Sequence, residues 1–249
     1  MRILFSSSSL TGIKETYGQT VTHKTPPFKI RNIRLFIAFR VFFNSRFYYP
    51  VFTILFLDFG LTLEQFALLN LVWALTIVLL EIPSGALADT VGRKNLLVFA
   101  GVCMVLEMAL LCFAPLGNPR LLFYIFFANR VLSGSAEAAA SGADEALAYD
   151  SLKQEGDPDD WGKVLVRQMG FRSMGFVVAM SLGAAVYDPA LMGHLAERVG
   201  LNVSLNQDIT LKFPLYLTFA TAILTLFITL AMKRTEPHNN GEISLGRKS

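Results

Sequence analysis

Long apolar stretches alternate with short polar ones along this chain. Each stretch holds about 20 residues, enough for a helix to cross a hydrocarbon layer of roughly 30 Å at about 1.5 Å per residue. None alternates in polarity over about ten residues, as the strands of a membrane β-barrel do, so we expect helices only. The pattern predicts an all-α, polytopic membrane protein with six transmembrane helices, at residues 35–57, 63–87, 95–114, 121–148, 164–187 and 213–232.

Basic residues gather on alternate connections between these stretches. With the N-terminus inside, fourteen Lys and Arg residues lie on the inner side, three lie in outer loops and five lie within the stretches. Because basic flanks stay in the cytoplasm, both termini are predicted to be cytoplasmic, most simply at the plasma membrane. We expect a mostly disordered tail at 1–34, a transmembrane domain at 35–232 and a second tail at 233–249. The outer loop 188–212 is expected to carry a short surface helix near 190–199.

Composition supports a membrane protein and excludes several other classes. Apolar residues make up 53% of the chain and charged residues 16%, whereas a soluble domain carries about 25% charge. A net charge of +3 from 22 basic and 19 acidic residues indicates no nucleic-acid partner. The sequence contains no phosphate-binding G-x-x-x-x-G-K-[ST] loop and no H-E-x-x-H or G-x-S-x-G motif. We therefore predict neither an ATP-driven pump nor an enzyme, and no cofactor or metal.

The loop between the second and third stretches has a distinctive composition. Gly85 would let a neighbouring helix approach closely, and Gly92 permits the positive φ of a tight turn. Asp89 lies where the second stretch leaves the membrane. Arg93 and Lys94 begin the third stretch, where cations oppose the helix dipole, so they are expected to serve topology or an interhelical pair. By itself this pattern indicates a positively flanked hairpin.

The same ten residues, G-A-L-A-D-T-V-G-R-K from Gly85 to Lys94, resemble the signature loop of the major facilitator superfamily. The resemblance implies half of that fold, with six helices arranged as two inverted three-helix repeats. It also implies that Asp89 and Arg93 belong to a gate whose contacts differ between outward-open and inward-open states. Asp150, at the inner end of the fourth stretch, is the expected partner of Arg93.

Charged residues also occur inside the fourth stretch. Arg130, Glu137 and Asp144 are spaced by seven residues each, which places them on one helical face with a drift of about 20° per step. Gly134 and Glu145 lie beside that face. A charge near the bilayer centre costs at least about 2.5 kcal/mol, so the face is predicted to line the bundle interior or an aqueous cavity. Purely structural ion pairs are the alternative. The Arg130 to Gly134 segment resembles the family's fourth-span signature, which implies a role for Arg130 in transport or proton coupling.

The first stretch adds a second polar face. Arg40, Asn44 and Tyr48 follow one another at intervals of four residues. Arg40 either extends to the inner interface or faces a cavity.

For two further charged residues, the sequence leaves two alternatives each. Arg46 is expected to pair with Glu107 or with Glu137. Glu81 is expected either to pair with Arg172 or to titrate during transport.

Small and hydroxylated residues recur on the last two stretches. Gly175, Ala179 and Gly183 are spaced by four and predict close helix contact. This segment aligns with the G-x-x-x-G-P-x-x-G-G signature of family antiporters, but Met180 replaces the proline, which argues against antiport. Four threonines on the sixth stretch are expected to bond back to their own helix and receive no function: Thr218, Thr221, Thr225 and Thr229.

The leading hypothesis is a secondary transporter that moves a small solute by alternating access, with protons as a candidate coupling ion at Glu137, Asp144 or Glu81. The family normally has twelve spans, so we expect a truncated half that is inactive alone, or one that joins a second six-helix half or another copy of itself. The alternative is a non-transporting assembly partner or sensor that keeps the fold.

Overall fold

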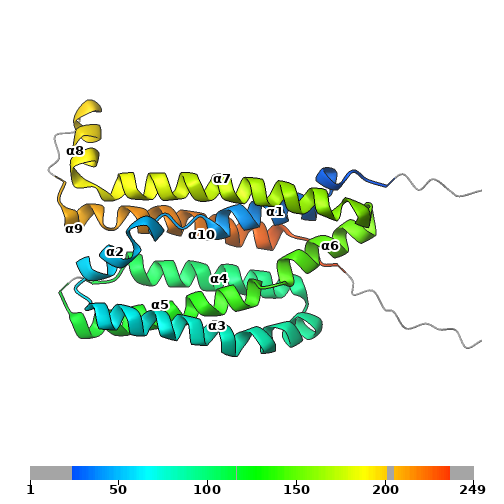
Figure 1. Cartoon of the computed structure of the whole chain (residues 1–249), viewed down its shortest axis with the longest axis horizontal. Coiled ribbons are helices and arrows are strands. Elements are labelled where there is room, and N and C mark those ends of the chain that lie inside the picture. Colours follow the sequence, from blue (N-terminus) through cyan, green and yellow to red (C-terminus); the bar gives the residue numbers. More distant parts are fainter. Residues whose placement is uncertain (1–23, 116, 201–204, 236–249) are drawn as a thin grey trace, which may run out of the picture.

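The computed structural model describes residues 24–115, 117–200 and 205–235, and every regular element within them is helical. The helices run along the long axis of the molecule, and the described chain begins and ends at the same end of the bundle (Figure 1). The principal helices are α1 (Arg31–Asn44), α2 (Phe52–Asp58), α3 (Leu63–Val91), α4 (Arg93–Cys112), α5 (Pro119–Ala140), α6 (Ala143–Glu155), α7 (Trp161–Tyr187), α8 (Pro189–Arg198), α9 (Gln207–Thr210) and α10 (Phe213–Ala231). Three short 3-10 turns complete them: η1 (Pro27–Lys29), η2 (Tyr49–Val51) and η3 (Pro158–Asp160).

Four helical segments among the described residues are long and apolar enough to cross a membrane, and they match four of the predicted stretches. They are Leu63–Ala88, Arg93–Cys112, Pro158–Tyr187 and Gln207–Ala231. The predicted surface helix is α8, which lies at the opposite end of the bundle from the described termini (Figure 1). These helices support an integral, multi-pass membrane protein.

The other two predicted stretches are not continuous helices, which corrects the sequence prediction. Stretch 35–57 divides into α1 and α2, because Pro50 in the intervening turn supplies no backbone N–H and restricts its neighbour. Stretch 121–148 divides into α5 and α6 at Gly142, whose φ of +73° lies in the left-handed region. Asp144 therefore lies beyond a break, and the seven-residue spacing no longer places it on the helical face of Arg130 and Glu137.

Threonines of α10 bond to the backbone exposed by the first break. The Phe47 amide donates to Thr218 Oγ1 at 3.0 Å, and Thr221 Oγ1 donates to the Ser45 carbonyl at 3.3 Å. Unpaired backbone groups are costly inside a membrane, so these bonds stabilise the unwound segment. The expected bonds of the threonines to their own helix are also present, for example from Thr218 to the Pro214 carbonyl at 2.8 Å. Their second role was not predicted.

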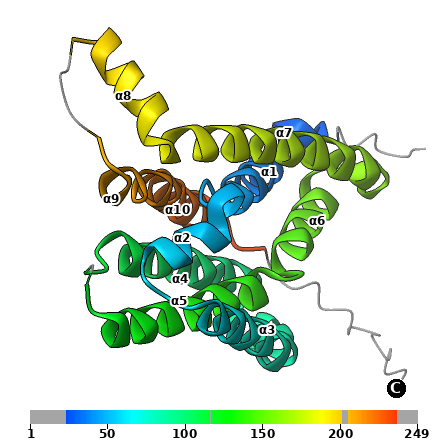
Figure 2. The ribbon, with the colours of Figure 1, turned by 60° about the vertical axis from the view of Figure 1, so that its left-hand side comes forward.

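The helices form two packed groups. One group holds α3, α4 and α5, the other holds α1, α7 and α10, and α4 packs on α10 between them (Figure 2). Phe56 and Phe126 stack edge-to-face in the core at a centroid distance of 4.5 Å. In contrast, α3 and α7 carry exposed apolar side chains such as Leu79 and Val166, as expected for surfaces that face lipid.

Glycines mark where these helices approach most closely. A Cβ on Gly134 would lie 2.8 Å from Thr76 of α3, and one on Gly175 would lie 2.9 Å from Val41 of α1. The predicted close contact along α7 is therefore confirmed. Gly85 is a correction, because a Cβ there would meet nothing within 4 Å. It lies on the exposed side of α3, and its neighbour Ser84 makes the contact with α5.

The N-terminal boundary differs from the expected one. Helix α1 begins at Arg31, inside the predicted tail, and Ile30 is buried. The preceding residues are tied to the end of α6, since the Thr25 amide donates to the Glu155 carbonyl at 3.0 Å. Residues 1–23 of the predicted tail, and 236–249 of the second one, lie outside the described residues.

Candidate functional site

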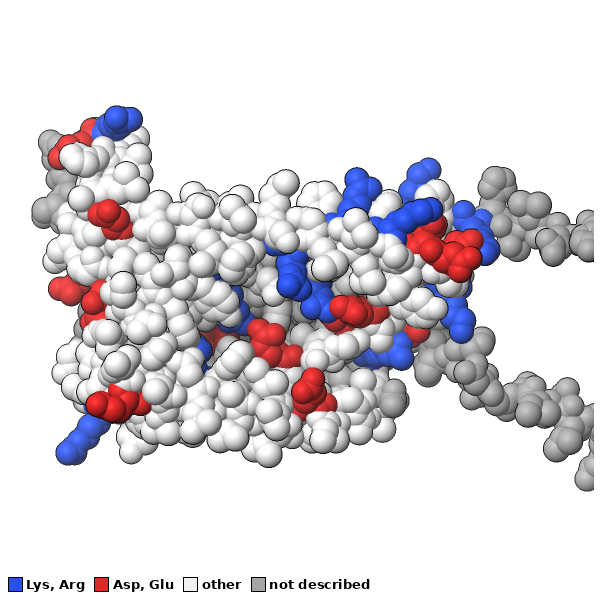
Figure 3. Space-filling model, viewed as in Figure 1, with Lys and Arg blue, Asp and Glu red and all other residues white. Residues whose placement is uncertain are grey.

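A group of charged side chains lies in the middle of one face of the molecule, among uncharged residues (Figure 3). Two neighbouring cavities open there, of about 310 Å³ and about 360 Å³, and Glu137 lies in the wall of both. Asn44, Arg46 and Arg172 line the first cavity, while Arg40 and Glu145 line the second. We call these two cavities and their lining residues the charged cleft.

Three charged residues meet at the base of the cleft, one in the break after α1 and one each on α4 and α5. Arg46 forms an ion pair with Glu107 of α4, and both are almost completely buried. Its other terminal nitrogen lies 3.7 Å from Glu137 of α5, whose side chain is 35% exposed. The alternative left open by the sequence is thus resolved, because Arg46 contacts both carboxylates. With all three ionised, this triad carries one net negative charge.

Arg130 does not line either cavity of the cleft. Its Nε and Nη2 atoms donate to Asn129 Oδ1 at 3.0 and 2.8 Å, and its guanidinium lies over the rings of Phe52 and Phe56. Asn129 in turn donates to the Glu107 carbonyl at 2.9 Å. Arg130 therefore faces the bundle interior and packs there as a buried cation on aromatic rings. The structure corrects its expected place among the cavity residues.

Arg40 joins α1 to the start of α6. It forms an ion pair with the buried Asp144, and its Nη2 lies 2.7 Å from a carboxylate oxygen of Glu145. With these partners, Arg40 lines the second cavity of the cleft. Asn44, one turn later, donates to the Arg40 carbonyl at 2.7 Å. Tyr48 lies beyond the end of α1 and is buried, so the predicted three-residue face is shortened to Arg40 and Asn44.

The remaining predicted cavity residues lie at the edge of the cleft or outside it. Glu81 is exposed and accepts a hydrogen bond from Ser141 at 3.3 Å. Within the described residues it forms no ion pair with Arg172. Gly134 faces α3 and allows close packing, so it is not a cavity residue.

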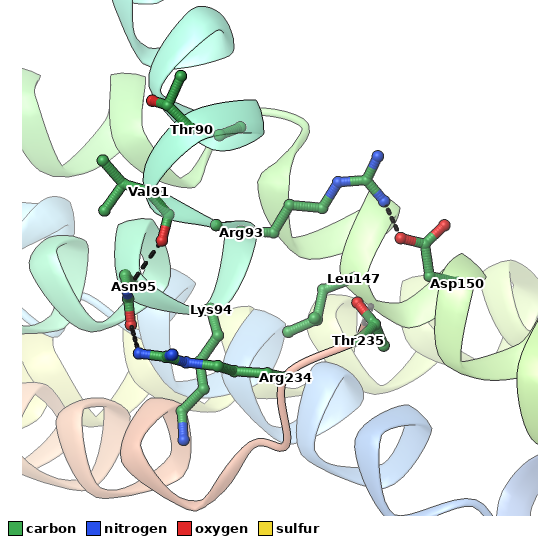
Figure 4. Close-up of a pocket in the computed structure, with 11 residues that line it drawn as sticks. Thr90, Val91, Arg93, Lys94, Asn95, Leu147, Asp150, Arg234 and Thr235 are labelled. Atoms are coloured by element: carbon green, nitrogen blue, oxygen red, sulfur yellow. Dashed lines mark hydrogen bonds and ion pairs between the residues drawn. The ribbon is translucent and has the colours of Figure 1, made fainter. Parts of the chain in front are cut away.

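The signature loop forms a second site, at the end of the bundle where the described chain begins and ends. Gly92 has a φ of +92°, as predicted for the turn between α3 and α4. Arg93 forms the expected ion pair with Asp150 of α6 (Figure 4). It also donates to the Ala146 carbonyl at 3.1 Å. Lys94 lines the same cavity, of about 670 Å³. The Asp89 side chain lies outside the described part of the chain.

The family model described as Major Facilitator Superfamily matches residues 34–248. The chain belongs to the major facilitator superfamily. A search of the curated proteins found no match. Major facilitator proteins are transporters of small solutes in the lipid bilayer and are not enzymes, so the chain is a major facilitator transporter in this general sense.

Several residues of this major facilitator chain make contacts that the sequence did not predict. Asn129 connects Arg130 to the backbone of α4, and its amide inside an apolar stretch was an available signal. Tyr49 lines the first cavity, but it falls in a turn that the hydropathy pattern did not reveal. Thr218 and Thr221 support the break between α1 and α2 through contacts far apart in sequence.

The Arg93–Asp150 pair is expected to hold α4 against α6. Partly exposed pairs contribute up to about 1 kcal/mol, or roughly a fivefold change in an opening equilibrium. In Arg93→Ala, a cysteine introduced at Leu147, which is buried beside this cavity, should therefore react about fivefold faster with a membrane-impermeant maleimide. Lys94→Ala is the matched control and should leave the labelling rate unchanged. Equal rates in both variants would show that the ion pair does not restrain α6.

Proposed function

We propose that this chain moves a small solute by alternating access through the charged cleft, coupled to protons at Glu137. The observation that supports this proposal is the net charge of the triad of Arg46, Glu107 and Glu137. Glu107 stays paired with Arg46 when Glu137 takes up a proton, so that proton does not leave the buried cation without a counter-charge. Protonation makes the triad neutral. A half-exposed carboxylate between two cavities also has access to both a solute and water.

We further propose that a second six-helix unit covers the open face of the cleft. Glu145 and Arg172 line the cleft and are exposed, and Glu81 is exposed near its edge. Each such charge costs at least about 2.5 kcal/mol against lipid, so water and protein are the favoured neighbours. The second unit is either another copy of this chain or further protein of the same fold. Both described ends are proposed to face the cytoplasm at the plasma membrane.

Reconstitution into liposomes with an imposed pH gradient tests the transport proposal. Proton flux is recorded with an enclosed pH-sensitive dye while sugars, amino acids and organic ions are added in turn. We expect one solute class to start proton flux. Glu137→Gln should reduce that flux at least tenfold, because the amide cannot carry a proton. Glu64→Gln, at the exposed outer end of α3, is the control and should retain flux.

The possible results separate the parts of the proposal. Solute-dependent flux that survives Glu137→Gln would remove Glu137 as the coupling group but keep transport. Absence of flux with every solute, for the chain alone and for its purified oligomer, would favour the non-transporting assembly partner or sensor.

A further inference from the structure

An apolar groove on the membrane-facing surface leads into the basic cavity at the inner end. The groove has a volume of about 300 Å³ and lies between α3, α4 and α5. Val91 and Asn95 line both the groove and the basic cavity, so the two spaces adjoin. The groove begins among residues such as Leu80 and Phe99, at the depth of the membrane-spanning helices.

The polar side chains that line the groove are already bonded to the protein. Ser84 Oγ lies 2.8 Å from the Ala138 carbonyl, and Ser135 Oγ donates to the Val131 carbonyl at 2.7 Å. Asn95 donates to the Val91 carbonyl at 2.8 Å. The groove therefore presents hydrocarbon, and half-exposed side chains such as Leu87 and Phe99 form its rim. An apolar occupant is favoured over water there.

Among the described residues, the basic cavity has more cations than carboxylates in its wall. Arg93 is paired with Asp150, but Lys94 and Arg234 contact no carboxylate within the described residues. Arg234 donates to the neutral side chain of Asn95 at 3.2 Å (Figure 4). The cavity also includes the first residues of α4, where unpaired backbone amides and the helix dipole favour an anion.

We propose that the groove and the cavity form one site for an anionic phospholipid of the inner leaflet. The phosphate lies between Lys94 and Arg234, and an acyl chain occupies the groove beyond Val91 and Asn95. Basic pockets between membrane helices on the cytoplasmic side suit anionic head groups. A free phosphate would use only the basic end, so the adjoining groove favours a lipid. The site lies outside the charged cleft, and the proposal does not depend on proton coupling.

Native mass spectrometry of the detergent-purified full chain tests the basic end of the site. The protein is titrated with phosphatidylglycerol and, separately, with phosphatidylcholine. Each cation near an anionic head group contributes roughly a fivefold change in affinity, so Lys94→Gln combined with Arg234→Gln should weaken phosphatidylglycerol binding about 25-fold. The control is Lys29→Gln with Arg34→Gln, two exposed cations outside the cavity, and it should bind as the unaltered protein does.

The apolar part of the site is tested by filling the groove. Leu87→Trp places a larger side chain at its half-exposed rim and should weaken phosphatidylglycerol binding at least fivefold. Leu71→Trp, on the same helix and similarly exposed but outside the groove, should not. Undiminished lipid binding in Leu87→Trp, or in the Lys94 and Arg234 double variant, would overturn the proposal. Inorganic phosphate that binds the lipid-free protein as tightly as phosphatidylglycerol would reassign the cavity to a free anion and also overturn it.

Discussion

Glu107→Leu is expected to destabilise the folded protein by about 3–5 kcal/mol, because it leaves the Arg46 guanidinium buried without its closest partner. Glu137, at 3.7 Å, is then the one carboxylate among the described residues still in contact with Arg46. Arg46→Met combined with Glu107→Leu removes both charges and should recover most of the lost stability, since apolar replacements of buried pairs are often neutral. Equilibrium unfolding in detergent micelles measures the free energy of unfolding of both variants.

The same pair of variants separates structural from functional roles of the triad. A stable double variant that still shows solute-dependent proton flux would mean that the buried pair only supports the fold. We expect it to lose flux, because Glu137 would then lack the neighbouring charge that sets its protonation. A single Glu107→Leu variant as stable as the unaltered protein would contradict the buried pairing. Glu64→Leu, at an exposed carboxylate of α3, controls for loss of charge alone.

Hydropathy located α3, α4, α7 and α10 because their apolar residues continue without interruption. The same averaging concealed the breaks near Pro50 and Gly142, since one such residue changes the mean hydropathy of a 20-residue window only slightly. Both residues are recognisable as helix breakers, but local sequence does not determine whether a membrane segment bends or ends. That outcome depends on distant partners, such as the Thr218 hydroxyl that bonds to the Phe47 amide.

The candidate site was predictable where a local pattern determines it. The signature loop gave the positive φ of Gly92 and the Arg93–Asp150 pair. Contacts between distant segments were harder to predict. Arg46 and Glu107 are 61 residues apart, and from sequence Glu107 and Glu137 were equally plausible partners of Arg46. Arg130 shows that a local pattern can also mislead. Its spacing from Glu137 suggested a shared cavity, but the side chain turns toward aromatic rings of α2 that hydropathy had assigned to one continuous helix.

Gly183→Ala is expected to separate α7 from the break between α1 and α2. The added Cβ would lie 1.7 Å from the Phe47 carbonyl oxygen and 2.6 Å from its carbon, so backbone must move. The backbone amide of Phe47 donates a hydrogen bond to Thr218 of α10. Because this bond restrains Phe47, we expect α7 to move instead. Overpacking of this kind costs about 1–3 kcal/mol or more. Thermal unfolding of the purified protein measures the loss.

Gly170→Ala on the same helix is the matched control with the opposite expected sign. A Cβ there meets nothing within 4 Å, so replacing a mid-helix glycine by alanine should stabilise α7 by roughly 0.5–1 kcal/mol. Because Ser173 and Phe176 of α7 line the charged cleft, the shift caused by Gly183→Ala should also make a cysteine at Ser173 more reactive toward maleimide. Equal stability of the two alanine variants would show that α7 does not pack closely against the Phe47 backbone. The position of α7 beside the charged cleft would then need another explanation.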